Sequence, residues 1–192
     1  MKKTDIVGVV LAGGNSSRMG SNKAFLRRGE ATFVEHAVGV LGKVFEHVII
    51  SANDPSLYDS LELHVIGDIH KGCGPMGGLH ATMVHARGKD IFVLSCDLPF
   101  VDISVVERLL AESADSDVVI AGDNSGPQPL CGLYRKSCRT TIEGMIKEKQ
   151  YSVLALVSRM KGKVVLFDDG RAFTNVNTPT DYDSMAEVLK SS

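Results

Sequence analysis

The chain has 192 residues, with 21 Lys and Arg against 23 Asp and Glu, which gives a formal net charge of −2. This near-balance argues against bulk electrostatic binding to nucleic acid or to an anionic membrane, since both favour a basic excess. Hydrophobic residues make up 44% and charged residues 23%, which excludes a disordered chain. No apolar stretch is long enough to cross a membrane. We therefore expect a single soluble domain over residues 1–192.

The N-terminus loosely resembles a secretory signal, because Lys2 and Lys3 precede an apolar run over residues 6–12. Asp5 interrupts that pattern, however, and the run is followed by a glycine-rich segment instead of a cleavage site. We interpret it as a first buried strand that leads into a loop.

The cysteines indicate a reducing compartment. Their spacing contains no C-x-x-C pair, so neither a zinc site nor a disulfide framework is expected from Cys73, Cys96, Cys131 and Cys138. With the other features, this favours a cytoplasmic protein.

Apolar runs of strand length alternate with longer stretches of helical periodicity. In chain order the pattern predicts a strand over 6–11, a helix over 34–45, a strand over 47–51, a short turn or helix from Asp54, a strand over 63–66, a helix over 76–86, a strand over 90–95, a helix over 105–112, strands over 117–121 and 129–134, helices over 137–148 and 153–160, a strand over 163–167 and a final helix over 178–189.

This alternation predicts a three-layer α/β domain with a mostly parallel sheet covered on both faces. Such sheets bind ligands beyond the carboxyl ends of their strands. Functional residues are therefore expected in the glycine-rich segment 13–23 and at Asn53, Asp68 and Asp97, which follow predicted strands.

The first strand leads into a loop with two adjacent glycines and two cations. Gly13 and Gly14 let the backbone approach a ligand closely, and successive N–H groups can form an anion-binding concavity. Arg18 offers a fork for phosphate oxygens and Lys23 a point charge. A triphosphate cradle explains this combination better than a polar surface loop does, although the pattern is not a Walker A loop.

Five segments together resemble the nucleotidyltransferases related to molybdenum cofactor guanylyltransferase. They are the loop L-A-G-G-x-S-x-R-M-G-x-x-K from Leu11 to Lys23, Gly74-Pro75-Met76-Gly77-Gly78-Leu79, Cys96-Asp97-Leu98-Pro99-Phe100, Gln128-Pro129-Leu130 with Tyr134, and Asn175-Val176-Asn177-Thr178-Pro179. The resemblance implies a Rossmann-like fold of the nucleotide-diphospho-sugar transferase type. It also implies GTP as donor, the terminal phosphate of the molybdopterin cofactor as acceptor, Mg²⁺ as cofactor, and transient contact with molybdoenzymes or cofactor-maturation proteins.

Asp97 is the candidate metal ligand. A carboxylate at the end of an apolar strand suits Mg²⁺, which also takes phosphate oxygens from a nucleotide. The matching residue in the family is the metal ligand, so Asp97 is assigned with Arg18 and Lys23 to the catalytic machinery. From position alone, Asp97 could instead be the N-cap of the following helix.

The resemblance places Leu11, Ala12, Gly13, Gly14 and Lys23 at the nucleotide. It adds Asn53 and Asp68 as contacts to the guanine nucleotide, although each could alone be a turn or cap residue. Asn175 and Asn177 alternate on an extended segment, so both amides point the same way. The family places that segment near the metal and the acceptor, whereas an Asx-turn before the final helix is the structural alternative.

Residues 72–77 match G-x-G-x-x-G, with Asp97 following 20 residues later, as in a dinucleotide-binding fingerprint. The match does not follow its strand directly, and Pro75 lacks the N–H that a pyrophosphate would need. We interpret the segment as a helix entered through Pro75, with Gly77 and Gly78 permitting close approach of a nucleobase.

Three alternative functions remain. A cytidylyltransferase acting on the same cofactor is one, since Leu98-Pro99-Phe100 departs from the Thr-Pro-Tyr more common in guanylyltransferases. A sugar-1-phosphate nucleotidyltransferase is another, and a non-catalytic nucleotide-binding module is the third. The combination of Arg18, Lys23 and Asp97 argues against the last.

Overall fold

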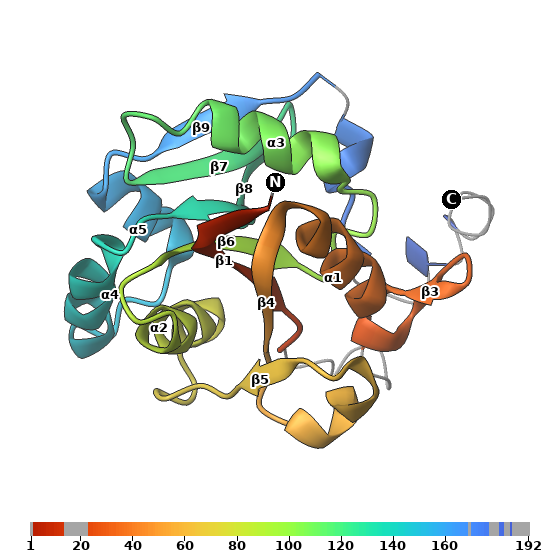
Figure 1. Cartoon of the computed structure of the whole chain (residues 1–192). Coiled ribbons are helices and arrows are strands. Elements are labelled where there is room, and N and C mark those ends of the chain that lie inside the picture. The colour runs from red at the N-terminus through yellow and green to blue at the C-terminus, as the bar shows by residue number, and fades with distance from the viewer. Residues whose placement is uncertain (1, 14–22, 169, 177–180, 183–184, 186–192) are drawn as a thin grey trace.

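The computed structural model describes residues 2–13, 23–168, 170–176, 181–182 and 185. A seven-stranded sheet forms its centre (Figure 1). Across the sheet the strands run in the order β5 (His64–Ile66), β4 (Phe45–Ser51), β1 (Lys3–Leu11), β6 (Asp90–Ser95), β8 (Gly126–Tyr134), β7 (Val118–Asp123) and β9 (Lys163–Leu166).

The sheet is mostly parallel, as predicted, with β8 as its antiparallel strand. β8 pairs antiparallel with both β6 and β7, whereas the remaining neighbours pair in parallel. The reason lies in the β7–β8 connection, which is too short for the crossover that parallel strands require. Asp123 closes this turn by accepting hydrogen bonds from the backbone and hydroxyl of Ser125, and Gly126 takes a φ of 130°.

Helices cover both faces of the sheet, which confirms the three-layer architecture (Figure 1). One hydrophobic cluster joins the sheet to α1 (Phe33–Val44) and α3 (Ile103–Ala111). A second joins it to α2 (Pro75–His85), α4 (Cys138–Lys147) and α5 (Val153–Arg159). Side chains alternate between the clusters along each strand, so that Val10 faces α1 and Val9 faces α2.

Helix boundaries follow from capping residues. Thr32 and Glu35 form a capping box at the start of α1. Asp54 caps a 3₁₀ helix, η3 (Pro55–Leu61), which confirms the predicted short helix. Short elements that the sequence did not predict are η2 (Lys23–Phe25), the hairpin of β2 (Arg27–Arg28) and β3 (Ala31–Thr32), and η4 (Gly170–Phe173). The predicted helix over 178–189 falls mostly outside the described residues.

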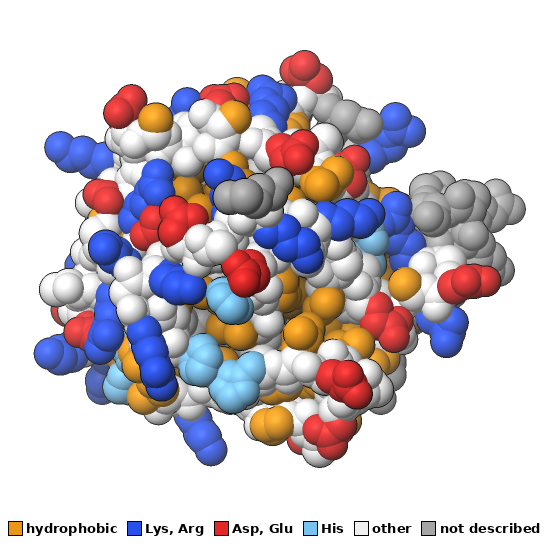
Figure 2. Space-filling model, viewed as in Figure 1, with side chains coloured by type: hydrophobic (Ala, Val, Ile, Leu, Met, Phe, Trp, Pro, Cys, Tyr) orange, Lys and Arg blue, Asp and Glu red, His pale blue; other side chains and the backbone are white. Residues whose placement is uncertain are grey.

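The chemistry of the core and surface agrees with the composition. All four cysteines are free and buried. On the face drawn in Figure 2, basic and acidic side chains are interspersed over the described residues and do not gather by sign. Within the part of the chain that the structure describes, no helix is long and apolar enough to cross a bilayer.

Two glycines give a test of this packing. A Cβ on Gly132 would lie 2.8 Å from Ile120 Cα and against the Val119 carbonyl, because β7 and β8 approach closely there. A Cβ on Gly144, in α4, would meet nothing within 4 Å. Urea unfolding should show Gly132→Ala destabilised by about 3 kcal/mol and Gly144→Ala stabilised by about 0.5–1 kcal/mol. Equal midpoints for the two variants would contradict the strand packing described here.

Candidate nucleotide site

The ends of three neighbouring strands, β1, β4 and β6, meet at one edge of the sheet. Leu11, the last residue of β1, pairs with Ser51 of β4 on one side and Ser95 of β6 on the other. The backbone N–H groups of Ala12 and Gly13 both donate to the Ser51 carbonyl at 3.0 Å. Because α1 and α2 enter the sheet from opposite faces on either side of β1, this edge is a topological switch point, where α/β proteins bind ligands.

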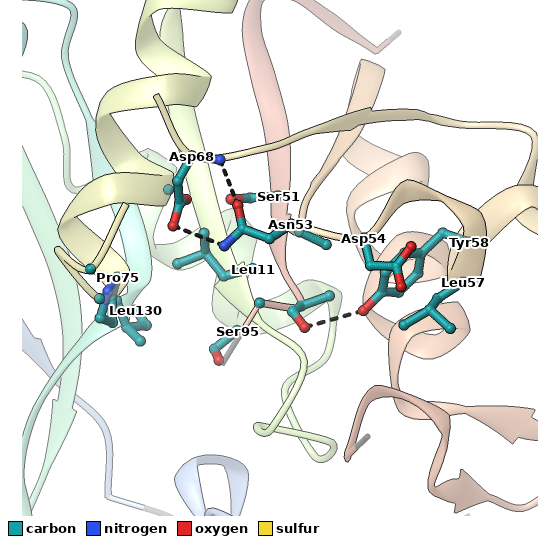
Figure 3. Close-up of a pocket in the computed structure, with 16 residues that line it drawn as sticks. Leu11, Ser51, Asn53, Asp54, Leu57, Tyr58, Asp68, Pro75, Ser95 and Leu130 are labelled. Carbon is teal, nitrogen blue, oxygen red and sulfur yellow. Dashed lines mark hydrogen bonds between the residues drawn. The ribbon is translucent and has the colours of Figure 1, made fainter. Parts of the chain in front are cut away.

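A pocket of about 610 Å³ opens at this edge (Figure 3). Five residues that the sequence predicted for the nucleotide lie in its wall: Leu11, Ala12, Gly13, Asn53 and Asp68. Residues from β4, η3, α2, β6, β8 and the segments after β4 and before α2 complete the lining: Ser51, Ala52, Asp54, Leu57, Tyr58, Gly72, Gly74, Pro75, Gly78, Ser95 and Leu130.

Asn53 and Asp68 bind each other across the mouth of the pocket (Figure 3). Asn53 Nδ2 donates to Asp68 Oδ2 at 3.1 Å, and the Asp68 backbone N–H donates to Asn53 Oδ1 at 2.9 Å. This reciprocal pair holds both side chains in place. It uses one carboxylate oxygen, while Asp68 Oδ1 has no hydrogen bond among the described residues.

Tyr58 on η3 supports the wall opposite α2. It is buried, and its hydroxyl donates to the Ala12 carbonyl at 3.2 Å. The Phe25 ring stacks on it with a centroid distance of 5.4 Å. Since Phe25 lies in η2, which begins at Lys23, this contact ties the end of the glycine-rich segment to the pocket. Sequence reasoning missed Tyr58, because its contacts are distant in the chain.

The first turn of α2 packs tightly onto the pocket. A Cβ on Gly78 would lie 2.6 Å from Ser51 Oγ, and one on Gly77 would lie 2.9 Å from the His70 carbonyl and 3.2 Å from Asp68 Cγ. Gly78 lines the pocket, so close approach of a nucleobase there stays a prediction, and the structure gives both glycines a further reason. They let the helix approach β4 and the Asp68 loop. The helix begins at Pro75, as predicted, with Gly74 as its N-cap.

Asp97 follows β6, and the cap alternative for it is wrong. The N-cap of α3 is Asp102, whose Oδ1 accepts from the N–H groups of Ser104 at 2.9 Å and Val105 at 3.3 Å. Among the described residues the Asp97 carboxylate makes no hydrogen bond or ion pair. Its backbone carbonyl accepts from the Val176 N–H at 3.3 Å, which brings the exposed Asn175 to the same place.

The electrostatics of Cys96 link Asp97 to Lys23. Burial chiefly, with the Asp97 carboxylate, raises the pKa of the Cys96 thiol to about 12, and the Lys23 ammonium opposes the shift. The Asp97 carboxylate and the Lys23 ammonium therefore both act on the Cys96 thiol, which follows the end of β6. With this pKa the thiol stays protonated at neutral pH and does not serve as a nucleophile.

The remaining predicted residues, Gly14, Arg18 and Asn177, lie outside the described residues. Sequence reasoning overlooked two others, Ser51 and Ser95, which line the pocket. The sequence held a signal for both serines. Each is the last residue of a strand and follows an apolar run, and the two strands are neighbours of β1 in the sheet.

Comparison with known proteins identifies relatives along most of the chain. Residues 8–163 match the MobA-like NTP transferase domain. A probable molybdenum cofactor guanylyltransferase of Pelotomaculum thermopropionicum is 34% identical, over 91% of this chain and 88% of the relative. The molybdenum cofactor guanylyltransferase of Vibrio parahaemolyticus is 30% identical, over 98% of both chains.

Solved structures agree with these relatives. The crystal structure of molybdopterin-guanine dinucleotide biosynthesis protein A from Archaeoglobus fulgidus superposes with a TM-score of 0.79 and 25% identity, over 97% of this chain and all of the other. Together with the domain match, this shows that the chain belongs to the family of MobA-like NTP transferases.

Proposed function

We propose that the protein transfers GMP from GTP to the terminal phosphate of molybdopterin, giving the guanine dinucleotide cofactor and pyrophosphate. The observation that carries this is the pocket at the strand ends, where the turn after β1 and the Asn53–Asp68 pair lie together. Relatives that bear the name molybdenum cofactor guanylyltransferase cover nearly the whole chain.

The Asn53–Asp68 pair supports guanine as the base. Guanine presents two adjacent donors, N1–H and the 2-amino group, and a carboxylate accepts both. Cytosine instead presents an acceptor, N3, next to its amino group, which the carboxylate would repel. Asp68 lines the pocket, and its Oδ1, which makes no hydrogen bond among the described residues, is available to accept such donors.

The residues at the end of β6 fit Mg²⁺. The ion takes oxygen ligands and is commonly held by one or two carboxylates together with substrate phosphates. Asp97 supplies such a carboxylate, and nothing among the described residues neutralises it. Asn175, next to Val176, is a further oxygen donor beside it. The described residues hold no group of three or more His, Cys, Asp or Glu arranged for a metal, so Asp97 and Asn175 would share the ion with the nucleotide phosphates. When bound, Mg²⁺ supplies positive charge to the phosphates at the reacting centre.

The chain's own residues then have to bind and orient two anionic groups, the triphosphate of GTP and the terminal phosphate of molybdopterin. Lys23 and Arg18 hold the β- and γ-phosphates, and their charge offsets the charge that develops as pyrophosphate leaves. The turn at Ala12 and Gly13 lines the pocket, so its backbone would lie close to a bound nucleotide. The attacking phosphate is already ionised at neutral pH, so no protein nucleophile or general base is needed. Positioning and charge neutralisation dominate the mechanism.

GTP and molybdopterin are the substrates in this proposal. Transient contact with molybdoenzymes or cofactor-maturation proteins would deliver the product. The four free, buried cysteines suit a reducing compartment, which supports the cytoplasm as the place of action.

Titration of the protein with GTP and with CTP, both in Mg²⁺, tests the choice of base. Hydrogen bonds to a charged group contribute about 1.5–3 kcal/mol, so GTP should bind about 10- to 100-fold more tightly. Asp68→Asn keeps the shape and the contact with Asn53 but loses the paired acceptors, and it should lose most of this preference. Tighter binding of CTP by the wild-type protein would instead identify a cytidylyltransferase.

A further inference from the structure

Two serine side chains form part of the pocket floor. Ser51 ends β4 and Ser95 ends β6, and both are register partners of Leu11. The three residues thus form one row across the sheet, and all three line the pocket. In Figure 3 Leu11 is drawn between the two serines. The row extends from the Asn53–Asp68 pair at one end to the start of the Asp97 segment at the other.

Both serines face the pocket from the α2 side of the sheet. Ile49 and Val93 belong to the cluster under α2, and each serine lies two positions further along the same strand. The position of Ser51 is fixed further by Gly78, since a Cβ there would lie 2.6 Å from Ser51 Oγ. The Ser51 side chain therefore lies directly beneath the first turn of α2.

Both serines are mostly buried, line the pocket and have no hydrogen-bond partner for their hydroxyls among the described residues. Ser51 is 3% exposed and Ser95 is 7% exposed. Their carbonyls accept backbone hydrogen bonds, but neither hydroxyl makes a hydrogen bond to any described residue. A hydroxyl that no protein group satisfies takes its partner from the space that it borders, either water or a ligand. For both serines that space is the same pocket.

We propose that Ser51 and Ser95 bind the nucleotide, Ser51 through the base and Ser95 through the sugar and phosphates. This rests on the proposed function. Ser51 lies two residues before Asn53, at the end of the pocket where the base is read. The Asn53–Asp68 pair accepts the donors of guanine, whereas O6 and N7 of the base need a donor, which a serine hydroxyl supplies. Ser95 lies two residues before Asp97, at the end where the phosphates belong.

Alanine variants test this assignment, because Ser→Ala removes a single oxygen atom and leaves the packing intact. The control is Ser158→Ala on α5, whose exposed hydroxyl donates to the Leu154 carbonyl away from the pocket. The probes are GTP and ribose 5-triphosphate, which lacks the base, and the readout is the Kd of each with Mg²⁺. Thermal unfolding of every variant is recorded alongside.

Losing one hydrogen bond should weaken GTP binding about 3- to 10-fold in both Ser51→Ala and Ser95→Ala. With ribose 5-triphosphate, the loss should disappear for Ser51→Ala and persist for Ser95→Ala. If both variants bind GTP as tightly as Ser158→Ala does, ordered water satisfies these hydroxyls and the proposal is wrong, while the proposed function stands. If Ser51→Ala weakens both probes equally, its assignment to the base is wrong. Failure of the wild-type protein to bind GTP would overturn the proposed function as well.

Discussion

Replacing Asp97 by Asn should abolish Mg²⁺-dependent guanylyl transfer, with turnover reduced about a thousandfold or more. Asn keeps the shape of the side chain and its capacity to accept hydrogen bonds, but it lacks the negative charge that a hard cation such as Mg²⁺ needs. The Asp97 carboxylate supports no hydrogen bond among the described residues, so the fold should be unaffected. Turnover and GTP affinity, each measured with and without Mg²⁺, check this result.

Asp102→Asn is the matched control. It is the same substitution five positions further on, at the residue that caps α3. Asn is also a good N-cap, so this variant should keep both its stability and its turnover. In Asp97→Asn, GTP binding without metal should be kept or improve slightly, because one repulsion with the triphosphate is removed. If Asp97→Asn keeps Mg²⁺-dependent transfer, the metal site must be sought elsewhere.

Lys23→Ala should lower turnover about 30- to 1000-fold. The lysine ammonium is expected to contact the phosphates more strongly as pyrophosphate leaves, and preorganised charged groups of this kind contribute about 2–4 kcal/mol. Lys23 begins η2 and is partly exposed, so its removal should change the Tm little. Steady-state kinetics with GTP and molybdopterin, together with thermal unfolding, measure the two effects.

Lys147→Ala serves as the charge control, since Lys147 is exposed at the end of α4. It removes the same charge at a distance from the strand ends and should leave turnover unchanged. Near-wild-type turnover of Lys23→Ala would mean that the phosphate cradle lies elsewhere.

Much of the fold could be predicted from hydrophobic periodicity. β6 is an example, because its residues from Ile91 to Ser95 are all buried, and the first four of them appear in the sequence as one continuous apolar run. The antiparallel direction of β8 could not be predicted in this way. A buried strand has the same pattern in either direction, and here the direction depends on the tight turn at Asp123–Gly126. The β2–β3 hairpin has strands of two residues, too short to show any period.

The candidate site was predictable where it follows strand ends. Asn53 and Asp68 each lie two residues beyond the end of a strand, β4 and β5, and the structure pairs them. The role of Asp97 was ambiguous, because a sequence does not show how many turns separate a strand from the next helix. Here the chain makes two turns, with the Leu98 N–H on the Ser95 carbonyl and the Val101 N–H on the Leu98 carbonyl, before α3 begins.

The tight contacts around α2 depend on tertiary packing and could not be predicted. Gly77 and Gly78 suggested close approach of a ligand, and Gly78 does line the pocket, but the atoms that a Cβ on either glycine would meet belong to the protein itself. Spacing along the chain reveals that a small residue is needed, and only the assembled fold reveals which atoms approach it.

The central claim, that this pocket transfers GMP from GTP, is tested most directly by one turnover assay. The full-length protein is incubated with molybdopterin and Mg²⁺, and with either GTP or CTP, and both pyrophosphate and the dinucleotide cofactor are quantified. The account predicts equimolar pyrophosphate and guanine dinucleotide cofactor with GTP, and little product with CTP. Formation of the cytosine dinucleotide with CTP, or binding of GTP with no release of pyrophosphate, would contradict it.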